Sequence, residues 1–292
     1  MKAPDFAYHR PERLPEAIEL LGSLENAKLL AGGQSLMPML NMRYVIPDHV
    51  IDLNRIPGLD EIRIDAGGVR LGALVRQRAI EHHVALRARA PVFAEALAHV
   101  GHYQTRSRGT VGGSLCHLDP AAELVLLAAL HGAIMHVAGR EGSREIRMDS
   151  WVASYMAPAM AADEVLTAIS FTLWQERCGE AFLEFARRRG DFALAAVAVR
   201  VALANGRISR IALALGGLAI APIRLSQAEA ALAGAIPDKA AADLIAAEVK
   251  TLDVMGDAHV SSSYRKSLAE TLTRRAFALA VERASEQSHV RD

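Results

Sequence analysis

Two pairs of adjacent glycines are the residues of this chain whose type and position best suit ligand chemistry. Gly32-Gly33 directly follows a short apolar run, and Gly112-Gly113 stands between hydroxyl side chains. Adjacent glycines let a backbone approach a ligand closely and turn successive N–H groups towards an anion. A pyrophosphate is the kind of anion that would use two such loops, so the pattern indicates a nucleotide cofactor.

Neither glycine pair belongs to a common nucleotide-binding signature. No Gly-Lys-Ser/Thr follows either pair, and neither pair fits G-x-G-x-x-G. A single glycine pair is more often only a turn, and that interpretation stays open for each pair taken alone. Two pairs, each with Ser or Thr beside it, favour the cofactor.

The other candidates for chemistry are weaker. The possible metal ligands are His82, His83, His99, His102, His117 and Asp119. They contain neither H-E-x-x-H nor a three-ligand spacing, so we interpret them as surface or hydrogen-bonded side chains and predict no metal ligand. G-x-S-x-G is absent, and no acid–base group other than His117 with Asp119 is evident, so we assign no catalytic residue. Residues 187–189, three successive arginines, suit either a solvated face or contact with an anionic cofactor or partner.

The elements around the first glycine pair predict a small α/β unit over residues 1–56. A helical pattern covers residues 15–24, an apolar run covers 28–31, and a second helix is expected over 36–40. A further apolar run over 49–53 completes the alternation of helix and strand. This alternation is typical of parallel strands.

A mixed α+β unit is expected over residues 57–176. Residues 69–74 alternate in polarity, and residues 134–137 and 165–171 resemble strands. Helices are expected over 79–90, 92–100 and 121–130, the last with Pro120 at its start.

The third unit, residues 177–292, is expected to hold a sheet followed by three helices. Apolar runs over 192–204 and 208–218 meet at Asn205-Gly206, a strong hairpin signal. Ser226 with Glu229 predicts a capping box for the first helix. Asp238 is expected to cap the second helix, and Ser263 or a neighbour the third. The whole chain is therefore predicted to be α+β.

Composition excludes several classes of protein. The 292 residues carry 33 basic and 33 acidic side chains, and only 5% are aromatic, which argues against a nucleic-acid partner. Two cysteines are too few for a disulfide framework or an iron–sulfur cluster. No secretory signal and no apolar stretch of about 20 residues is present, so we expect a cytoplasmic protein without a membrane span.

The glycine segments resemble the FAD-binding medium subunit of molybdenum hydroxylases, the carbon-monoxide-dehydrogenase and xanthine-dehydrogenase family. The segments that carry the resemblance are 31–36 (Ala-Gly-Gly-Gln-Ser-Leu), 110–115 (Thr-Val-Gly-Gly-Ser-Leu), 119–124 (Asp-Pro-Ala-Ala-Glu-Leu) and 187–192 (Arg-Arg-Arg-Gly-Asp-Phe). The resemblance extends over nearly the whole chain. This chain has Ser114 where family members often carry Asn, and Cys116 and Leu118 where Ala is frequent.

The resemblance implies that FAD lies between the first two units, with its pyrophosphate on the two glycine loops. The implied cofactor-binding residues are Ala31, Gly32, Gly33, Gln34, Ser35, Leu36, Thr110, Val111, Gly112, Gly113, Ser114, Asp119, Glu123, Leu166 and Phe192. Within this set, Asp119 and Glu123 correspond to polar groups near the ribityl chain, and Leu166 and Phe192 to positions near the flavin ring.

The resemblance also implies an electron-transfer role. A large molybdenum-cofactor subunit would oxidise the substrate, and a small subunit with [2Fe–2S] clusters would pass electrons to FAD on this chain, as a dimer of heterotrimers. The third unit, which lacks a glycine loop, would then help to dock the partners and to close the flavin pocket. A self-contained FAD-dependent oxidase or dehydrogenase and a non-enzymatic nucleotide-binding module are the alternatives.

Overall fold

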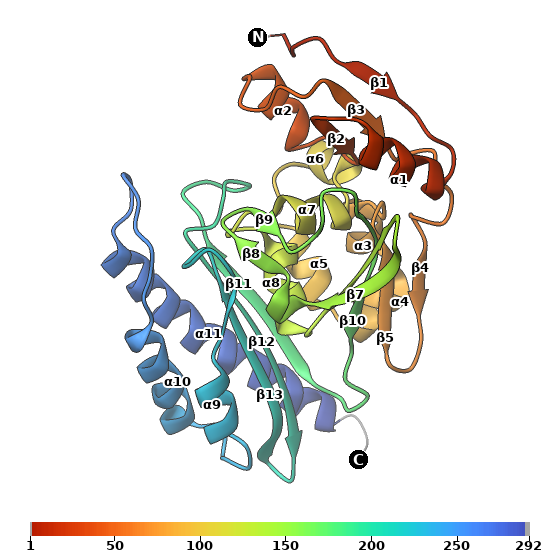
Figure 1. Ribbon diagram of the computed structural model, residues 1–292. Helices are drawn as coiled ribbons and strands as arrows, with labels where there is room; N and C mark the ends of the chain where they lie inside the picture. The colour runs from red at the N-terminus through yellow and green to blue at the C-terminus, as the bar shows by residue number, and fades with distance from the viewer. Residues whose placement is uncertain (1, 290–292) are drawn as a thin grey trace.

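The computed structural model describes residues 2–289, which form three main sheets and the helices that cover them. The first sheet and its helices (red in Figure 1) lie at one end of the molecule, above α6 and α7. The third sheet lies between α5 and α8 on one side and the C-terminal helices on the other (Figure 1). The predicted α+β class is confirmed.

The N-terminal sheet is parallel, as the alternation of apolar runs predicts. Its strands follow the order β1-β3-β2, and every pairing is parallel. Its elements are β1 (Ala7–His9), α1 (Leu14–Ser23), β2 (Ala27–Leu30), α2 (Leu36–Asn41) and β3 (His49–Asp52). The sequence missed β1, because its three residues are largely exposed and leave no apolar pattern.

The middle sheet is antiparallel, in the order β4-β5-β10-β6-β7. Its strands are β4 (Ile62–Ile64), β5 (Gly68–Gly72), β6 (Ile134–Gly139), β7 (Gly142–Arg147) and β10 (Val165–Thr172). The short elements η1 (Met148–Ser150), β8 (Val152–Ser154) and β9 (Ala157–Pro158) connect β7 to β10.

The helices of the middle part are shorter than predicted. They are α3 (Gln77–His82), α4 (Val84–Arg89), α5 (Val92–Leu97), α6 (Tyr103–Arg108), α7 (Val111–His117) and α8 (Glu123–Leu130). The single helix predicted over 79–90 is wrong. His83 has an extended backbone there, and its imidazole accepts a hydrogen bond from the N–H of Leu86, so a new helix begins. The helix predicted over 92–100 ends earlier, at Leu97.

The C-terminal sheet is antiparallel and is followed by the three predicted helices. Its elements are β11 (Gly179–Phe185), β12 (Ala195–Ala204), β13 (Arg207–Gly216), β14 (Ile223–Arg224), α9 (Ser226–Ala231), α10 (Lys239–Thr251) and α11 (Ser262–His289). Asn205 and Gly206 both have positive φ, 52° and 71°, as a tight hairpin turn between twisted strands requires. The predicted hairpin is therefore confirmed.

Two of the three predicted helix caps are present. The Asp238 carboxylate accepts from the N–H of Ala241 at 3.1 Å, and Ser261, a neighbour of Ser263, accepts from the N–H of Tyr264 at 3.2 Å. The prediction of a capping box formed by Ser226 and Glu229 is wrong, because no side chain caps the start of α9.

Glu229 reaches a tertiary partner instead of its own helix start. It accepts from the N–H of Leu213 at 2.8 Å and forms an ion pair with Arg224 at 2.7 Å. A charged partner binds a carboxylate more strongly than a neutral N–H does, so the capping contact is not made.

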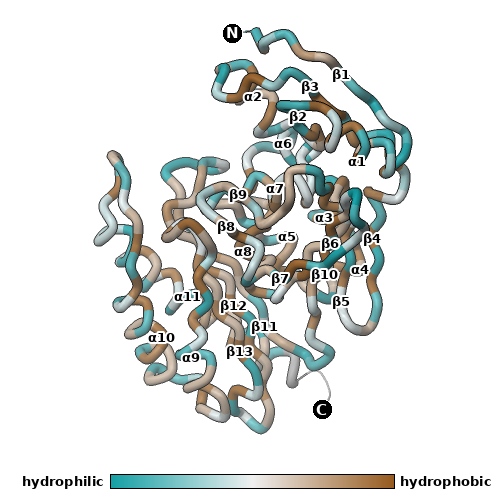
Figure 2. Tube along the Cα trace, viewed as in Figure 1, coloured by the Kyte–Doolittle hydropathy of each residue, from teal (hydrophilic) through white to brown (hydrophobic). Residues whose placement is uncertain are grey.

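The C-terminal sheet shares a core with the middle part of the chain. Alternate residues such as Val197 and Val199 pack against α10 and α11. Their neighbours Phe182, Ala196 and Ala198 face α5 and α8 and belong to the largest core cluster. Hydrophobic residues accordingly gather along α8 and the strands beside it (Figure 2). This shared core fixes the position of the C-terminal sheet against the helices that line the candidate site.

Candidate functional site

A cavity of about 540 Å³ lies where the N-terminal sheet meets the middle helices. Its size is within the range of small-molecule and cofactor sites. The loop after β2 forms one wall, and α7 with the segment before it forms the opposite wall. The start of α8, the start of β10, residues 100–101 and residues 190–192 also contribute to the lining.

The structure brings together all but one of the predicted site residues. The lining contains Ala31, Gly32, Gly33, Gln34, Ser35, Leu36, Thr110, Gly112, Gly113, Ser114, Asp119, Glu123, Leu166 and Phe192. Val111 is the exception. Its side chain is fully buried in the main hydrophobic core, and its N–H donates to the carbonyl of Val75.

One glycine of each pair is required by packing within the protein. A Cβ on Gly32 would lie 2.3 Å from the carbonyl oxygen of Arg108, and one on Gly112 would lie 2.6 Å from that of Ala73. Real Cβ atoms do not approach backbone this closely. Gly32 therefore holds the first glycine loop against the segment that precedes the second.

The other glycine of each pair lies beside the cavity. Gly33 has φ +70°, a left-handed conformation that other residues rarely adopt. A Cβ on Gly113 would meet only the Thr110 Oγ1 closely, at 2.9 Å. These two glycines keep the backbone accessible from the cavity.

The first glycine loop presents a row of free hydrogen-bond donors. Five successive backbone N–H groups donate to no acceptor among residues 2–289. They belong to Gly32, Gly33, Gln34, Ser35 and Leu36. Gly32 is buried and Gly33, Ser35 and Leu36 are half-buried, whereas Gln34 is exposed. Buried backbone donors are almost always paired in proteins, with protein, water or ligand. Successive free N–H groups form a concave anion site, which a phosphate or pyrophosphate satisfies.

The second glycine loop is different, because its backbone donors are already used. The N–H of Gly112 donates to Ala73, that of Gly113 to the Thr110 hydroxyl at 3.0 Å, and that of Ser114 to the Thr110 carbonyl. Thr110 thereby caps α7. The second loop offers a close, flat backbone surface and the Ser114 hydroxyl, and the first loop offers the free donors.

Two lining groups near α7 and α8 have strongly shifted acidity. Burial raises the pKa of Glu123 to about 8, and the negative charges of Glu184 and Asp119 add to this effect. Burial also raises the pKa of the Cys116 thiol to about 12, so this thiol is not a nucleophile. Glu123 is the lining carboxyl that can hold a proton near neutral pH.

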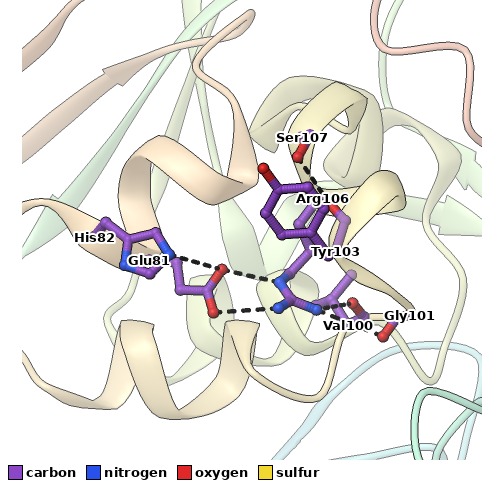
Figure 3. A network of polar contacts seen from close by, with 7 residues as sticks. All are labelled: Glu81, His82, Val100, Gly101, Tyr103, Arg106 and Ser107. Atoms are coloured by element: carbon purple, nitrogen blue, oxygen red, sulfur yellow. Dashed lines mark hydrogen bonds and ion pairs between the residues drawn. The ribbon is translucent and has the colours of Figure 1, made fainter.

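An ion pair behind the cavity wall positions the segment after α5. Arg106 Nε lies 2.9 Å from Glu81 Oε2, and Arg106 Nη1 donates to the carbonyl of Val100 at 3.0 Å (Figure 3). Val100 and Gly101 both line the cavity. The sequence did not reveal this pair, because the two residues are 25 positions apart and their helices contact only in the folded chain.

The segment that follows the three arginines also reaches the cavity. Gly190, with φ +78°, packs so closely that a Cβ would lie 2.8 Å from the carbonyl oxygen of Gly101. Asp191 and Phe192 then complete the wall. Arg187 Nε lies 3.6 Å from Asp191 Oδ2, and Arg187 is exposed while Asp191 is half-buried. The third part of the chain thus contributes to the lining, as the sequence led us to expect.

Known sequence families match the chain over nearly all of its length. Residues 4–174 match the FAD binding domain in molybdopterin dehydrogenase, and residues 180–280 match the CO dehydrogenase flavoprotein C-terminal domain. The chain belongs to the FAD-binding medium subunits of the molybdenum hydroxylases. The resemblance found in the glycine segments is thereby confirmed, and FAD is the cofactor of this medium subunit.

Similar proteins match the medium subunit from end to end. The nicotine 6-hydroxylase medium subunit of Paenarthrobacter nicotinovorans is 38% identical, over 94% of this chain and 97% of its own. The caffeine dehydrogenase subunit beta of a Pseudomonas species is 34% identical, over 97% of both chains. The carbon monoxide dehydrogenase medium chain of Hydrogenophaga pseudoflava is 32% identical, over 95% of this chain and 97% of its own.

Solved structures share the fold. The carbon monoxide dehydrogenase of Hydrogenophaga pseudoflava that lacks the Mo-pyranopterin moiety superposes with a TM-score of 0.93, at 33% identity over 97% of this chain and 99% of that chain. Quinoline 2-oxidoreductase from Pseudomonas putida 86 superposes with a TM-score of 0.92, also at 33% identity, over 97% of this chain and 99% of that chain. The relatives are subunits of molybdenum-containing oxidoreductases, which implies large and small partner subunits that carry molybdenum and iron–sulfur clusters.

The described part of this medium subunit shows no candidate cluster of metal ligands. Among residues 2–289, no three His, Cys, Asp or Glu side chains converge to hold a metal ion. The two cysteines, Cys116 and Cys178, are free thiols. Over the same residues, no helix is both long and apolar enough to cross a membrane.

Proposed function

We propose that this medium subunit carries electrons from the [2Fe–2S] clusters of a small partner subunit, through its FAD, to an external acceptor. The observation that carries the proposal is the row of free N–H groups from Gly32 to Leu36 at the wall of a cofactor-sized cavity. In this role bound FAD supplies the redox chemistry, and the chain supplies binding, orientation and electrostatics.

We propose an order in which the residues of the cavity bind FAD. The free donors of residues 32–36 would receive the pyrophosphate, and Gly112, Gly113 and Ser114 would form the facing wall. Asp119 and Glu123 would lie along the ribityl chain. Leu166 and Phe192, from β10 and from the segment before β12, would contact the ring.

We also propose the domain division and the assembly that the family resemblance suggests. Residues 1–56 and 57–176 would form the two halves of the FAD-binding part, and residues 177–292 the C-terminal domain. Each division carries one of the three main sheets. The complex would be a dimer of heterotrimers, with partner-binding surface on the third part. The free thiols of Cys116 and Cys178 support a reducing compartment such as the cytoplasm.

Selective removal of FAD from the purified complex tests the electron path. Substrate should then still reduce the iron–sulfur clusters, because they precede FAD, whereas reduction of an external dye should stop. Addition of FAD should restore dye reduction. Unimpaired dye reduction by the FAD-free complex would contradict the proposal.

The isolated medium subunit separates this role from that of a self-contained oxidase. Loaded with FAD, it should not oxidise the substrate of its complex, because in the proposed division of labour the molybdenum and the clusters belong to the partner subunits. An artificial reductant should still reduce its flavin. Substrate oxidation by the isolated chain would favour the self-contained enzyme.

A further inference from the structure

A pyrophosphate that is bound on the first glycine loop and faces the second requires the two loops to keep a fixed spacing. The loops belong to different parts of the chain. The first follows β2 of the N-terminal sheet, and the second opens α7 beside the middle sheet. With the proposed placement of the pyrophosphate as the premise, two residues that keep this spacing are found behind the cavity wall.

Asn54 binds the backbone at the start of the first glycine loop. Its Nδ2 donates to the carbonyl of Ala31 at 2.8 Å and to Asp52 Oδ1 at 2.6 Å. β2 and β3 are parallel, so their carboxyl ends lie at one edge of the sheet, and Asn54 comes to lie beside Ala31. The C=O and N–H of a trans peptide point to opposite sides of one plane. The bond to the Ala31 carbonyl therefore also fixes the direction of the N–H of Gly32, the first of the free donors.

Arg76 connects Asn54 to the segment before the second glycine loop. Its Nη2 donates to Asn54 Oδ1 at 2.6 Å, and its Nη1 donates to the carbonyl of Arg108 at 2.6 Å. This Arg108 carbonyl is the group that lies against Gly32. The backbone of Arg76 also pairs with that of Thr110, the cap of α7. One guanidinium thus binds the N-terminal part and the middle part of the chain at once.

The chemistry of the two side chains suits this double contact. The Nδ2 of Asn54 faces two acceptors and its Oδ1 faces a donor, so both ends of the carboxamide are used. A guanidinium presents its donors in a rigid planar fork, whereas the ammonium of lysine is a single point charge. Arg76 is half-buried and Asn54 is exposed, so replacement of either residue removes little hydrophobic packing.

We propose that Arg76 and Asn54 are positioning residues for FAD. The link runs from the Ala31 carbonyl through Asn54 and Arg76 to the Arg108 carbonyl, and it holds the two glycine loops at the spacing of the pyrophosphate. Neither Asn54 nor Arg76 lines the cavity, so they act through the loops and not by contact with the cofactor. Because the two side chains bind in series, loss of either one breaks the whole link.

Titration of the flavin-free, full-length medium subunit with FAD tests the link. Arg76→Met and Asn54→Ala should each raise the dissociation constant for FAD by about 10-fold to 100-fold, the effect of losing a hydrogen bond to a charged group. The double variant should bind FAD no more weakly than the weaker single variant, because a series link is broken only once. Losses that multiply in the double variant would overturn the link.

Arg76→Lys separates the link from simple attraction between a positive charge and the pyrophosphate. Lysine keeps the charge but cannot replace both arms of the fork, so this variant should bind FAD as weakly as Arg76→Met. Wild-type affinity in Arg76→Lys would show that the charge alone matters and would overturn the link. Denaturant unfolding of each flavin-free variant establishes that it is folded during the titration. Asn54 is exposed, so Asn54→Ala provides the test if Arg76→Met does not fold.

Arg89→Met is the matched control. Arg89 also donates to two backbone carbonyls, those of Asp65 and Ala66, but it lies outside the cavity lining and contacts neither glycine loop. It should keep the wild-type affinity for FAD. An equal loss of affinity in Arg89→Met and Arg76→Met would show a general effect of removing a surface arginine and would contradict the link.

Phosphorus NMR at saturating FAD gives a readout at the pyrophosphate itself. In Arg76→Lys the two phosphorus resonances of bound FAD should differ from those of the wild type. The flavin absorbance spectrum should keep its shape, because the link ends at the glycine loops. Phosphorus resonances identical to those of the wild type would show that Arg76 does not position the pyrophosphate.

Gly33→Val tests the premise in the same titration. If it binds FAD as tightly as the wild type, the pyrophosphate does not lie on the first loop, and both the proposed placement and the link fail. If it loses FAD while the Arg76 and Asn54 variants keep the wild-type affinity, only the link fails. The two failures are thus distinguishable, and neither depends on the electron path.

Discussion

The Cα of Gly32 lies so close to the carbonyl of Arg108 that an added Cβ would be 2.3 Å from its oxygen. Residues 76 positions apart in the chain are thus in backbone contact, and this contact joins the two glycine loops into one site. Gly32 is required by the protein itself, and the free donors beside it are available because the loop is held open against this neighbour.

We expect Gly32→Ala to destabilise the chain even without flavin. The methyl group must push the loop away from Arg108, and overpacking of this kind costs about 1–3 kcal/mol. Denaturant unfolding of the flavin-free protein measures the change. Gly67→Ala is the control, because its Cβ would meet only Asp65 Oδ1 at an ordinary 3.5 Å. Equal stability of the two variants would contradict the close contact.

Gly33→Val and Gly113→Val should abolish flavin binding. At Gly113 a branched side chain crowds the lining residues Thr110 and Ala31. At Gly33 it opposes the left-handed backbone of φ +70° and crowds Leu30 and Met37 at 3.2 Å, which distorts the loop that carries the free donors. Flavin absorbance per chain after purification measures occupancy. Gly234→Val is the matched control, since Gly234 has φ +78°, has open space around it and lies outside the cavity lining. It should retain flavin. Full occupancy in both cavity variants would remove these glycines from the site.

Glu123 should make the flavin-free chain less stable as pH rises. Its pKa is raised from 4.5 to about 8 by burial, so between these values the unfolded chain loses a proton that the folded chain keeps. The contribution of Glu123 to the free energy of unfolding is therefore greatest below pH 4.5, and it decreases as the pH rises to about 8. Glu123→Gln should flatten this fall in denaturant unfolding measured from pH 5 to 8. An unchanged slope would show that Glu123 ionises normally.

The buried pair of Arg200 and Glu180 should be sensitive to loss of either partner. Their Nε and Oε1 atoms are 2.8 Å apart, and the side chains are 2% and 1% exposed. Arg200 also stacks on the ring of Trp174, at 4.2 Å. Arg200→Met leaves an unpaired carboxylate next to α5 and should cost about 3–5 kcal/mol.

Replacement of both partners provides the test of that explanation. Arg200→Met combined with Glu180→Met removes both charges and should recover most of the loss in denaturant unfolding. If the double variant is as unstable as the sum of the single variants, packing on Trp174 is the dominant contribution, and the ion pair is not.

Several features of this protein follow from local sequence alone. The Asn205-Gly206 turn and the Asp238 cap each depend on residues close together in the chain, and each was predicted correctly. The parallel pairing of β2 with β3 was predicted from the alternation of helix and strand, whereas β1 of the same sheet was missed. The glycine pairs also revealed the class of ligand, because glycine's conformational freedom is a property of the residue itself. The family resemblance then extended this reading to FAD.

Tertiary contacts decided the rest. Glu229 pairs with Arg224 and does not cap its helix. His83 caps the second of two helices where one continuous helix was predicted. Val111 points into the core although it stands beside two cavity glycines. The packing of strands and helices decides which backbone donors remain free. It also brings Glu184 to His99, although the two residues are 85 positions apart in the chain. Local sequence cannot specify such pairings, because their partners become neighbours only when apolar faces from distant segments are buried together.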